Sequence, residues 1–274
     1  MLESIDYKAI QDFIDLEAKC GNKLNNKGLS PKSLGILKKT LSQIFKSARR
    51  DKLISDNPCE FVKTPKQIKR EPNILTLEQL QVLLENIKDE NVYPIIYLTS
   101  VYGLRRSEVL GIKWDSIDYE NMTVTIKHTV VQGNNLYEKD STKNESSYRT
   151  YPMSEKIKEI FLRQKKREEE NKQKFGKNYI SNDYVFKWDN GEIIKPDYVS
   201  KKLGELLEKN GLPHIRFHDL RHSCASYLAS KGFQLKDIQE WLVHADIETT
   251  ANIYAHLYAD RKDQILTSMN LMSY

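Results

Sequence analysis

The stretch His218-Asp219-Leu220-Arg221-His222 determines how this sequence is interpreted. An arginine can hold a phosphate through two parallel hydrogen bonds, and a histidine can exchange a proton near neutral pH. His218 and Arg221 are three residues apart, so on a helix their side chains lie on one face and can converge on one phosphate. His222 points elsewhere, and we interpret it as a packed structural histidine.

The same stretch has a second interpretation as a metal site. His218 and His222 are spaced i, i+4, a spacing that can place two metal ligands on one helix face. Arg221 lies between them and would repel a cation, and the sequence offers no evident third ligand. We therefore expect no metal here.

Two further segments contain residues suited to phosphate chemistry. Gly103-Leu104-Arg105-Arg106-Ser107-Glu108 adds a second arginine, Arg105, and the segment 249–256 contains Tyr254, whose phenol can act as a nucleophile. Taken alone, Arg105 would be a surface residue paired with Glu108. Tyr254 alone would be a core residue, because the chain has fifteen tyrosines. The joint pattern argues against both of these simpler interpretations.

Together these residues resemble a known family. Arg105, His218, Arg221, His244 and Tyr254, in this order and spacing, are similar to the tyrosine recombinase (phage integrase) family from about Leu75 onward. Around Arg221 and Tyr254 the sequence resembles integrases of conjugative transposons and temperate phages, which are mobile genetic elements. The resemblance implies a site-specific DNA recombinase of the integrase or excisionase type, active in DNA integration and recombination.

The resemblance also implies the reaction. Arg105 and Arg221 would clamp the non-bridging oxygens of the scissile phosphate, and Tyr254 would attack phosphorus to form a 3′-phosphotyrosine. Because the covalent link keeps the phosphoester energy, strands are rejoined without ATP, metal or other cofactor.

Proton transfer is assigned to three further residues on the same basis. Lys143, in Ser141-Thr142-Lys143-Asn144-Glu145, resembles the family's general acid, and Lys139 is a neighbouring alternative. His218 fits the general base, and His244 fits an additional phosphate-contacting donor. Where the family commonly has Leu-Gly-His, this chain has Leu242-Val243-His244, so a β-branched residue stands at a position that usually has glycine.

Two other functions share parts of this pattern. A type IB topoisomerase uses the same chemistry to relax supercoils, and a DNA-binding regulator could occupy sites without cleaving them. The expected partners are double-stranded DNA attachment sites, further copies of the chain as dimers and tetramers in a synaptic complex, and an accessory excision factor. The apolar residues between Arg261 and Met272 could pack on the chain itself or dock on a neighbouring subunit.

Composition sets the broad class. The 274 residues, 39% of them hydrophobic, are enough to bury a core, and the three cysteines show no CxxC spacing. No apolar run reaches membrane-spanning length and no signal-peptide pattern is present, so a cytoplasmic protein without a membrane partner is expected. Residues 1–70 hold fifteen Lys/Arg against eight Asp/Glu, a net charge of +7, whereas the remainder carries −2. A basic N-terminal segment favours contact with a phosphate backbone.

The chain is predicted to form two domains, one at 1–63 and one at 74–274, joined by a polar linker at 64–73 bracketed by Pro65 and Pro72. In the first, a helix over about 7–20 carries Ile10, Phe13 and Ile14. Ser30-Pro31 starts a second helix, whose apolar residues recur up to Arg50. The family's N-terminal DNA-binding domain usually begins with a further helix or helix pair, so the chain is expected to be a shortened form.

The second domain is predicted to be mainly α-helical with a small antiparallel β-sheet, an α+β fold. Thr76 starts a helix through about Ile87, a buried helix over 94–102 ends at Gly103, and the next helix begins at Arg105. Strands are expected at 122–131, 149–153 and 184–187. Further helices are expected at about 155–171, 197–210, 219–231, 235–243, 250–257 and 260–268. The charged run 163–170 is interpreted as a solvated helix face.

Overall fold

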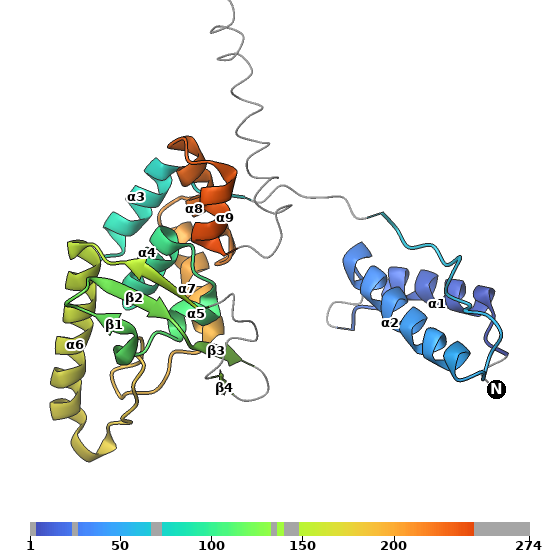
Figure 1. Ribbon diagram of the computed structural model, residues 1–274, viewed down its shortest axis with the longest axis horizontal. Coiled ribbons are helices and arrows are strands. Elements are labelled where there is room, and N and C mark those ends of the chain that lie inside the picture. The colour runs from blue at the N-terminus through green and yellow to red at the C-terminus, as the bar shows by residue number, and fades with distance from the viewer. Residues whose placement is uncertain (1–3, 24–26, 67–72, 133–135, 140–147, 244–274) are drawn as a thin grey trace, which may run out of the picture. The chain divides into compact units, whose positions relative to one another are not determined.

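The computed structural model describes residues 4–23, 27–66, 73–132, 136–139 and 148–243. The chain divides into two compact units, Met1–Glu71 and Pro72–Tyr274 (Figure 1). In the described part of the chain, no helix combines the length and the apolar character needed to cross a bilayer.

The N-terminal unit is built on two helices, α1 (Tyr7–Cys20) and α2 (Pro31–Arg50), whose bounds agree with the prediction. Ser30 caps α2 by accepting a hydrogen bond from the Ser33 amide, and Pro31 occupies the first turn. Phe13, one of the apolar residues noted in the first helix, is exposed, whereas Ile10 and Ile14 are buried. A two-helix unit can bury only a narrow stripe of each helix. Its core consists of Ile10, Ile14, Leu34, Phe45, Cys59 and Val62.

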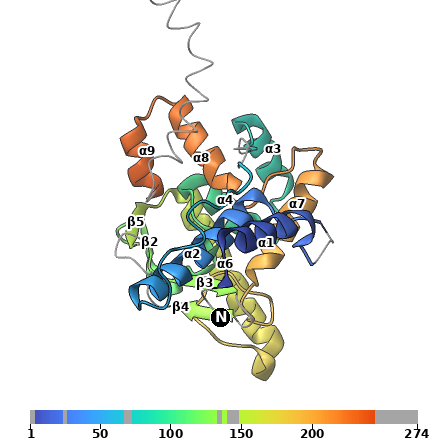
Figure 2. The ribbon, with the colours of Figure 1, turned by 90° about the vertical axis from the view of Figure 1, so that its right-hand side faces the viewer.

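The C-terminal unit confirms the predicted α+β class. Figures 1 and 2 show a mainly helical unit, whose described part contains two small antiparallel sheets. The helices are α3 (Leu77–Asn86), α4 (Tyr93–Tyr102), α5 (Arg106–Leu110), α6 (Glu155–Phe175), α7 (Pro196–Lys209), α8 (Asp219–Ser230) and α9 (Leu235–Leu242). One sheet has the order β1 (Ile117–Asp118), β2 (Thr123–Ile126), β5 (Arg149–Pro152), and the other pairs β3 (Thr129–Gln132) with β4 (Leu136–Lys139).

Local sequence signals set the helix ends as predicted. Thr76 and Gln79 form the capping box that starts α3. Eight of the ten residues of α4 are buried, and Gly103 ends the helix in a left-handed conformation. Helix α4 packs against α8, and α8 packs against α9. The segment after α4, which carries Arg105, therefore lies beside α8, which carries Arg221.

The strand predicted at 122–131 is wrong as a single element. β2 ends at Ile126 and pairs with β5, whereas β3 begins at Thr129 and pairs with β4. The chain bends at Lys127 and His128 because β3 packs on α5 and α7 instead of continuing the first sheet. Gly111 allows the close approach, since a Cβ there would lie 2.3 Å from the His128 carbonyl oxygen.

Two further predictions need correction. Residues 184–187 form isolated bridges, Lys113 with Tyr184 and Lys187 with Ile193, instead of a strand. In the charged run 163–170, Glu168 is buried and accepts hydrogen bonds or ion pairs from Trp114, Lys172 and Lys187. The helices predicted at 250–257 and 260–268 lie outside the described residues.

Candidate active site

The turn between α4 and α5 places the first arginine. Gly103 adopts φ +62°, and a Cβ there would lie 2.1 Å from Leu242 Cδ2. The left-handed backbone therefore favours glycine at this position, and a side chain there would displace Leu242 of α9. Two residues later, Arg105 stands at the N-cap position of α5, so the helix begins at Arg106, one residue later than predicted.

Arg105 is held by Glu108. The Arg105 amide donates to Glu108 Oε2 at 2.8 Å, and its Nη1 donates to Oε1 at 2.6 Å. This is not an ordinary surface ion pair, because the Glu108 side chain is only 3% exposed and a second arginine, Arg149 on β5, also donates to Oε2 at 2.8 Å. One buried carboxylate thus orients two guanidiniums.

The charge state of Glu108 follows from these contacts. Burial alone would raise its pKa, but the hydrogen bonds and charges of Arg149 and Arg105 outweigh burial and lower the pKa to about 2. Glu108 is therefore ionised throughout the neutral range.

Replacing Glu108 by glutamine is expected to reduce the acid sensitivity of folding. The contacts that lower the pKa of Glu108 stabilise the folded state above pH 4.5. This stabilisation is lost as the pH falls toward 2. A shift of this size corresponds to roughly 3 kcal/mol. Urea unfolding at neutral and acidic pH should show the E108Q variant less stable than the wild type at neutral pH, with the difference shrinking as pH falls. Glu169→Gln, at an exposed position, is the control. A pH-independent difference would contradict the assignment.

The second arginine, Arg221 on α8, is fully buried. Its Nη1 donates to the Gly103 carbonyl at 2.5 Å, and its Nη2 donates to the Leu242 carbonyl. Burial, with the positive charges of Arg105 and Arg149, lowers its pKa to about 10, so it remains charged at neutral pH.

The end of α9 lies at both arginines. The Leu242 carbonyl accepts from Arg221, and the Val243 carbonyl accepts from Arg105 Nη2 at 3.5 Å. Val243 adopts a left-handed conformation, φ 50° and ψ 57°, so the backbone at this position is indeed the kind that glycine favours. A β-branched residue there costs about 1–3 kcal/mol of backbone strain.

His218 precedes α8 and packs edge to face on His222, with ring centroids 5.1 Å apart. Burial, and then the charges of His222, Arg221 and Arg105, lower the His218 pKa to about 4. The ring is neutral at pH 7, and the lowered pKa makes it a weaker base than an exposed histidine. His222 is buried, as interpreted from the sequence. Within the described ranges, no three His, Cys, Asp or Glu side chains are grouped to hold a metal ion.

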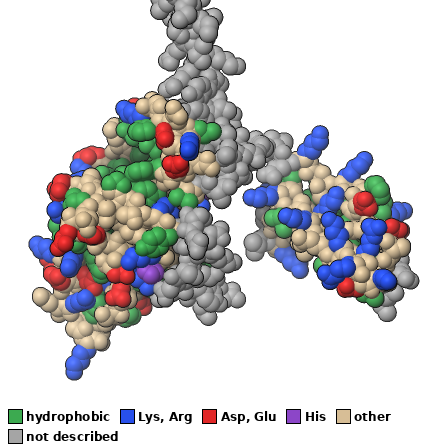
Figure 3. Space-filling view, viewed as in Figure 1, with side chains coloured by type: hydrophobic (Ala, Val, Ile, Leu, Met, Phe, Trp, Pro, Cys, Tyr) green, Lys and Arg blue, Asp and Glu red, His purple; other side chains and the backbone are tan. Residues whose placement is uncertain are grey.

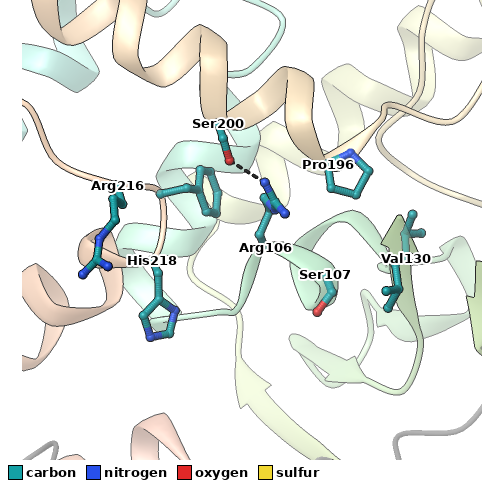
Figure 4. Close-up of a pocket in the computed structure, with 9 residues that line it drawn as sticks. Arg106, Ser107, Val130, Pro196, Ser200, Arg216 and His218 are labelled. Carbon is teal, nitrogen blue, oxygen red and sulfur yellow. Dashed lines mark hydrogen bonds between the residues drawn. The ribbon is translucent and has the colours of Figure 1, made fainter. Parts of the chain in front are cut away.

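His218 also lines a hollow of about 460 Å³ (Figure 4). Arg216 lies beside it and is held by Asp219 through contacts of 2.9 and 3.0 Å. Across the hollow, Arg106 Nη1 donates to Ser200 Oγ at 2.6 Å. The other lining residues are Ser107, Val130, Val131, Pro196 and Phe217. The hollow thus combines two guanidiniums and an imidazole with an apolar wall.

The structure brings Arg105, Arg221 and His218 into one region. Lys143, His244 and Tyr254 lie outside the described residues, as does the side chain of the alternative Lys139. Sequence reasoning missed the parts played by Arg149 and Tyr151, which it treated only as strand residues. Their i, i+2 spacing on a strand places both on one face, which was the available signal.

Comparison with known proteins gives a consistent result. The model of the Phage integrase family matches residues 73–261. The chain is 29% identical over 267 residues to a "Tyrosine recombinase XerC-like" protein of Caldanaerobacter subterraneus subsp. tengcongensis, covering 91% of this chain and 68% of that protein. It is 25% identical over 274 residues to the ICEBs1 integrase of Bacillus subtilis, covering 98% and 72%. The structure of the Tn1549 transposon integrase in complex with a circular intermediate DNA superposes with a TM-score of 0.76 at 23% identity, covering 99% of this chain and 87% of that one.

Proposed function

Because this chain belongs to the phage integrase family, we propose that Arg105 and Arg221 are the two phosphate-holding arginines of a tyrosine-type site-specific recombinase. The observation that carries this assignment is that both guanidiniums, from distant parts of the chain, donate to the adjacent carbonyls of Leu242 and Val243. Two planar cations held at one place can stabilise a pentacoordinate phosphorane without changing their protonation state.

The charge balance at this place suits an anionic transition state. Arg105, Arg149 and Arg221 face the single carboxylate of Glu108, which leaves an excess of two positive charges in the described part of the site. Because the side chain of Arg221 is buried and that of Arg149 is mostly buried, water screens their charges little. A phosphate that binds beside Arg105 would be attracted by this excess of two positive charges.

In the proposed reaction, the Tyr254 oxygen attacks phosphorus and the bond to the 5′-oxygen breaks, leaving a 3′-phosphotyrosine. Neutral His218 takes the phenol proton, and Lys143 donates a proton to the leaving 5′-oxygen. His244 supplies a further donor to the phosphate. A 5′-hydroxyl from a partner strand then reverses the step and joins new strands, with no metal or cofactor taking part.

We assign DNA binding to both units. Residues 1–63 would form a DNA-holding domain, 64–73 a linker and 74–274 the catalytic domain. Helix α2 contains six basic residues and no acidic ones. Lys and Arg side chains are spread over the visible face of the N-terminal unit (Figure 3). Lys32, Lys39 and Lys46 are seven residues apart, so they form a row along one face of α2. Such a row fits a phosphate backbone.

Neutralising this lysine row should weaken DNA binding and flatten its salt dependence. In the triple Lys32→Gln, Lys39→Gln, Lys46→Gln variant, the log–log slope of affinity against salt should fall by about 0.9 for each phosphate that the lysines no longer neutralise. Fluorescence anisotropy on a labelled duplex measures this slope between roughly 50 and 200 mM salt. The matched control replaces Lys165, Lys174 and Lys177, also exposed, by glutamine. Equal slopes in the two triple variants would mean that the row is only a solvated surface.

The central test is capture of the covalent intermediate. The full chain is incubated with short duplexes that carry one nick within randomised sequence, so that the cleaved fragment diffuses away and the adduct accumulates. Adducts are recovered under denaturing conditions and the attached DNA is sequenced. We expect a narrow set of related sequences, each joined to the protein through its 3′-phosphate.

The same experiment separates the alternatives. Adducts with unrelated sequences, together with relaxation of supercoiled plasmid, would indicate topoisomerase activity. DNA binding without any adduct would indicate a non-catalytic regulator. The solved neighbours include a lambda integrase dimer bound to a core site, which supports DNA-bound multimers as the working form. We propose two dimers joined as a tetramer on two sites, with an accessory excision factor directing excision.

A further inference from the structure

The C-terminal end of α9 is held by three groups of the candidate active site. The last carbonyls of a helix have no partner within the helix and need one from elsewhere. Here the Trp241 carbonyl accepts from the Tyr151 hydroxyl, the Leu242 carbonyl from Arg221 and the Val243 carbonyl from Arg105. The position of this helix end and the positions of the two arginines are therefore coupled.

Tyr151 on β5 also contacts the other side of the site. Its side chain is buried, and its hydroxyl accepts a hydrogen bond from Arg149 Nε at 2.7 Å while donating to the Trp241 carbonyl. The same Arg149 guanidinium holds Glu108, which in turn holds Arg105. The Tyr151 hydroxyl thus joins the Glu108 cluster to the end of α9.

We propose that Tyr151 is a positioning residue for strand cleavage, whose hydroxyl fixes Arg105 and Arg221 relative to each other through Arg149 and the end of α9. The inference rests on the proposed function of the two arginines. Without the hydroxyl, Arg149 Nε and the Trp241 carbonyl are deprived of a buried partner, and the segment Leu242–Val243 can shift against both guanidiniums. A displacement of about 1 Å in such groups can reduce a rate by up to about 100-fold.

The competing explanation is that Tyr151 makes a buried hydrogen bond that contributes only to stability. The chain offers a matched control in Tyr102. Its ring stacks on that of Tyr151 with centroids 4.7 Å apart, it is also buried, and its hydroxyl donates to the Pro152 carbonyl at 2.8 Å. Tyr102→Phe therefore removes a comparable buried hydroxyl whose hydrogen bond goes to β5 and not to α9.

The experiment compares the full-length wild type, Tyr151→Phe and Tyr102→Phe on a nicked duplex recovered from the randomised library. Three quantities are measured: the single-turnover rate of adduct formation at saturating protein, the affinity for the duplex and the melting temperature. We expect both variants to be destabilised to a similar extent and to keep their DNA affinity. Only Tyr151→Phe should react more slowly, by about 10-fold or more. A purely structural role would affect the two variants equally.

A second variant, Arg149→Lys, tests the same hydrogen bond in case Tyr151→Phe does not fold. Arg149→Lys keeps a positive charge beside Glu108 but cannot also supply the Nε donor to Tyr151. It should lower the rate as Tyr151→Phe does, and combining the two should add little, because both interrupt the same series of hydrogen bonds.

Each result decides the inference. Equal rates for Tyr151→Phe and Tyr102→Phe, with active wild type, would overturn the role of Tyr151 alone. If Tyr151→Phe does not fold, an unimpaired Arg149→Lys enzyme would overturn it. Wild type that forms no adduct with any duplex of the library would overturn the proposed function, and this inference with it.

Discussion

Tyr254→Phe is expected to abolish covalent attachment to DNA while leaving DNA binding nearly intact. The phenyl ring retains the shape of tyrosine but lacks the oxygen that attacks phosphorus, so no phosphotyrosine can form. The measurement is the protein–DNA adduct on a denaturing gel, with the nicked duplex selected from the library, alongside binding by anisotropy. Because the expected effect is complete, even slow adduct formation is informative.

The sequence supplies a matched control for this prediction. Tyr258 lies four residues further along, and Tyr258→Phe should form the adduct at the wild-type rate. An adduct from the Tyr254 variant would reject Tyr254 as nucleophile. Absence of the adduct in the Tyr258 variant alone would assign the attack to Tyr258.

Arg221→Ala and Arg105→Ala should each lower the single-turnover cleavage rate by roughly 100-fold or more, the scale of removing one preorganised donor to a transition state. Lysine at either position should restore only part of the rate, since an ammonium cannot make the planar two-point contact of a guanidinium. Rates are measured at saturating protein, so that weaker binding does not contribute.

Arg221→Ala should also destabilise the fold, because the Arg221 side chain is fully buried and donates hydrogen bonds to the Gly103 and Leu242 carbonyls. Melting temperatures accompany each rate, and Arg221→Lys reports on a variant that keeps the charge. Arg167→Ala is the control. Arg167 lies on helix α6, away from Arg105 and Arg221, and its guanidinium pairs with Asp189. Wild-type rates in folded Arg221 and Arg105 variants would exclude the phosphate-holding roles.

The sequence alone determined the features that depend on near neighbours in the chain. The caps at Ser30 and Thr76 and the turn at Gly103 were predictable, because each is set by contacts within a few residues. The order and spacing of Arg105, His218, Arg221, His244 and Tyr254 were enough to indicate the family. These inferences needed no knowledge of packing.

Tertiary packing determined two features that the local sequence pattern did not predict. Residues 122–131 alternate like one strand, yet α5 and α7 draw the second half into another sheet. Glu168 lies in a run of charges whose pattern predicts a solvated face, yet Trp114 and Lys187 from other segments bury it. Propensity and periodicity describe a segment's own preferences, and here partners distant in sequence overrode them.

The geometry of the candidate site also depends on partners that are distant in sequence. Sequence indicated Arg105 and Arg221 as phosphate ligands, but not that Glu108 is buried between Arg105 and Arg149, nor that the end of α9 lies against Arg105 and Arg221. These contacts join residues far apart in the chain, and only the packing of α4, α8, α9 and β5 brings them together. Tertiary structure also shifts the pKa values: the guanidiniums of Arg149 and Arg105 outweigh burial and lower the pKa of Glu108 to about 2, and burial lowers the pKa of His218 to about 4.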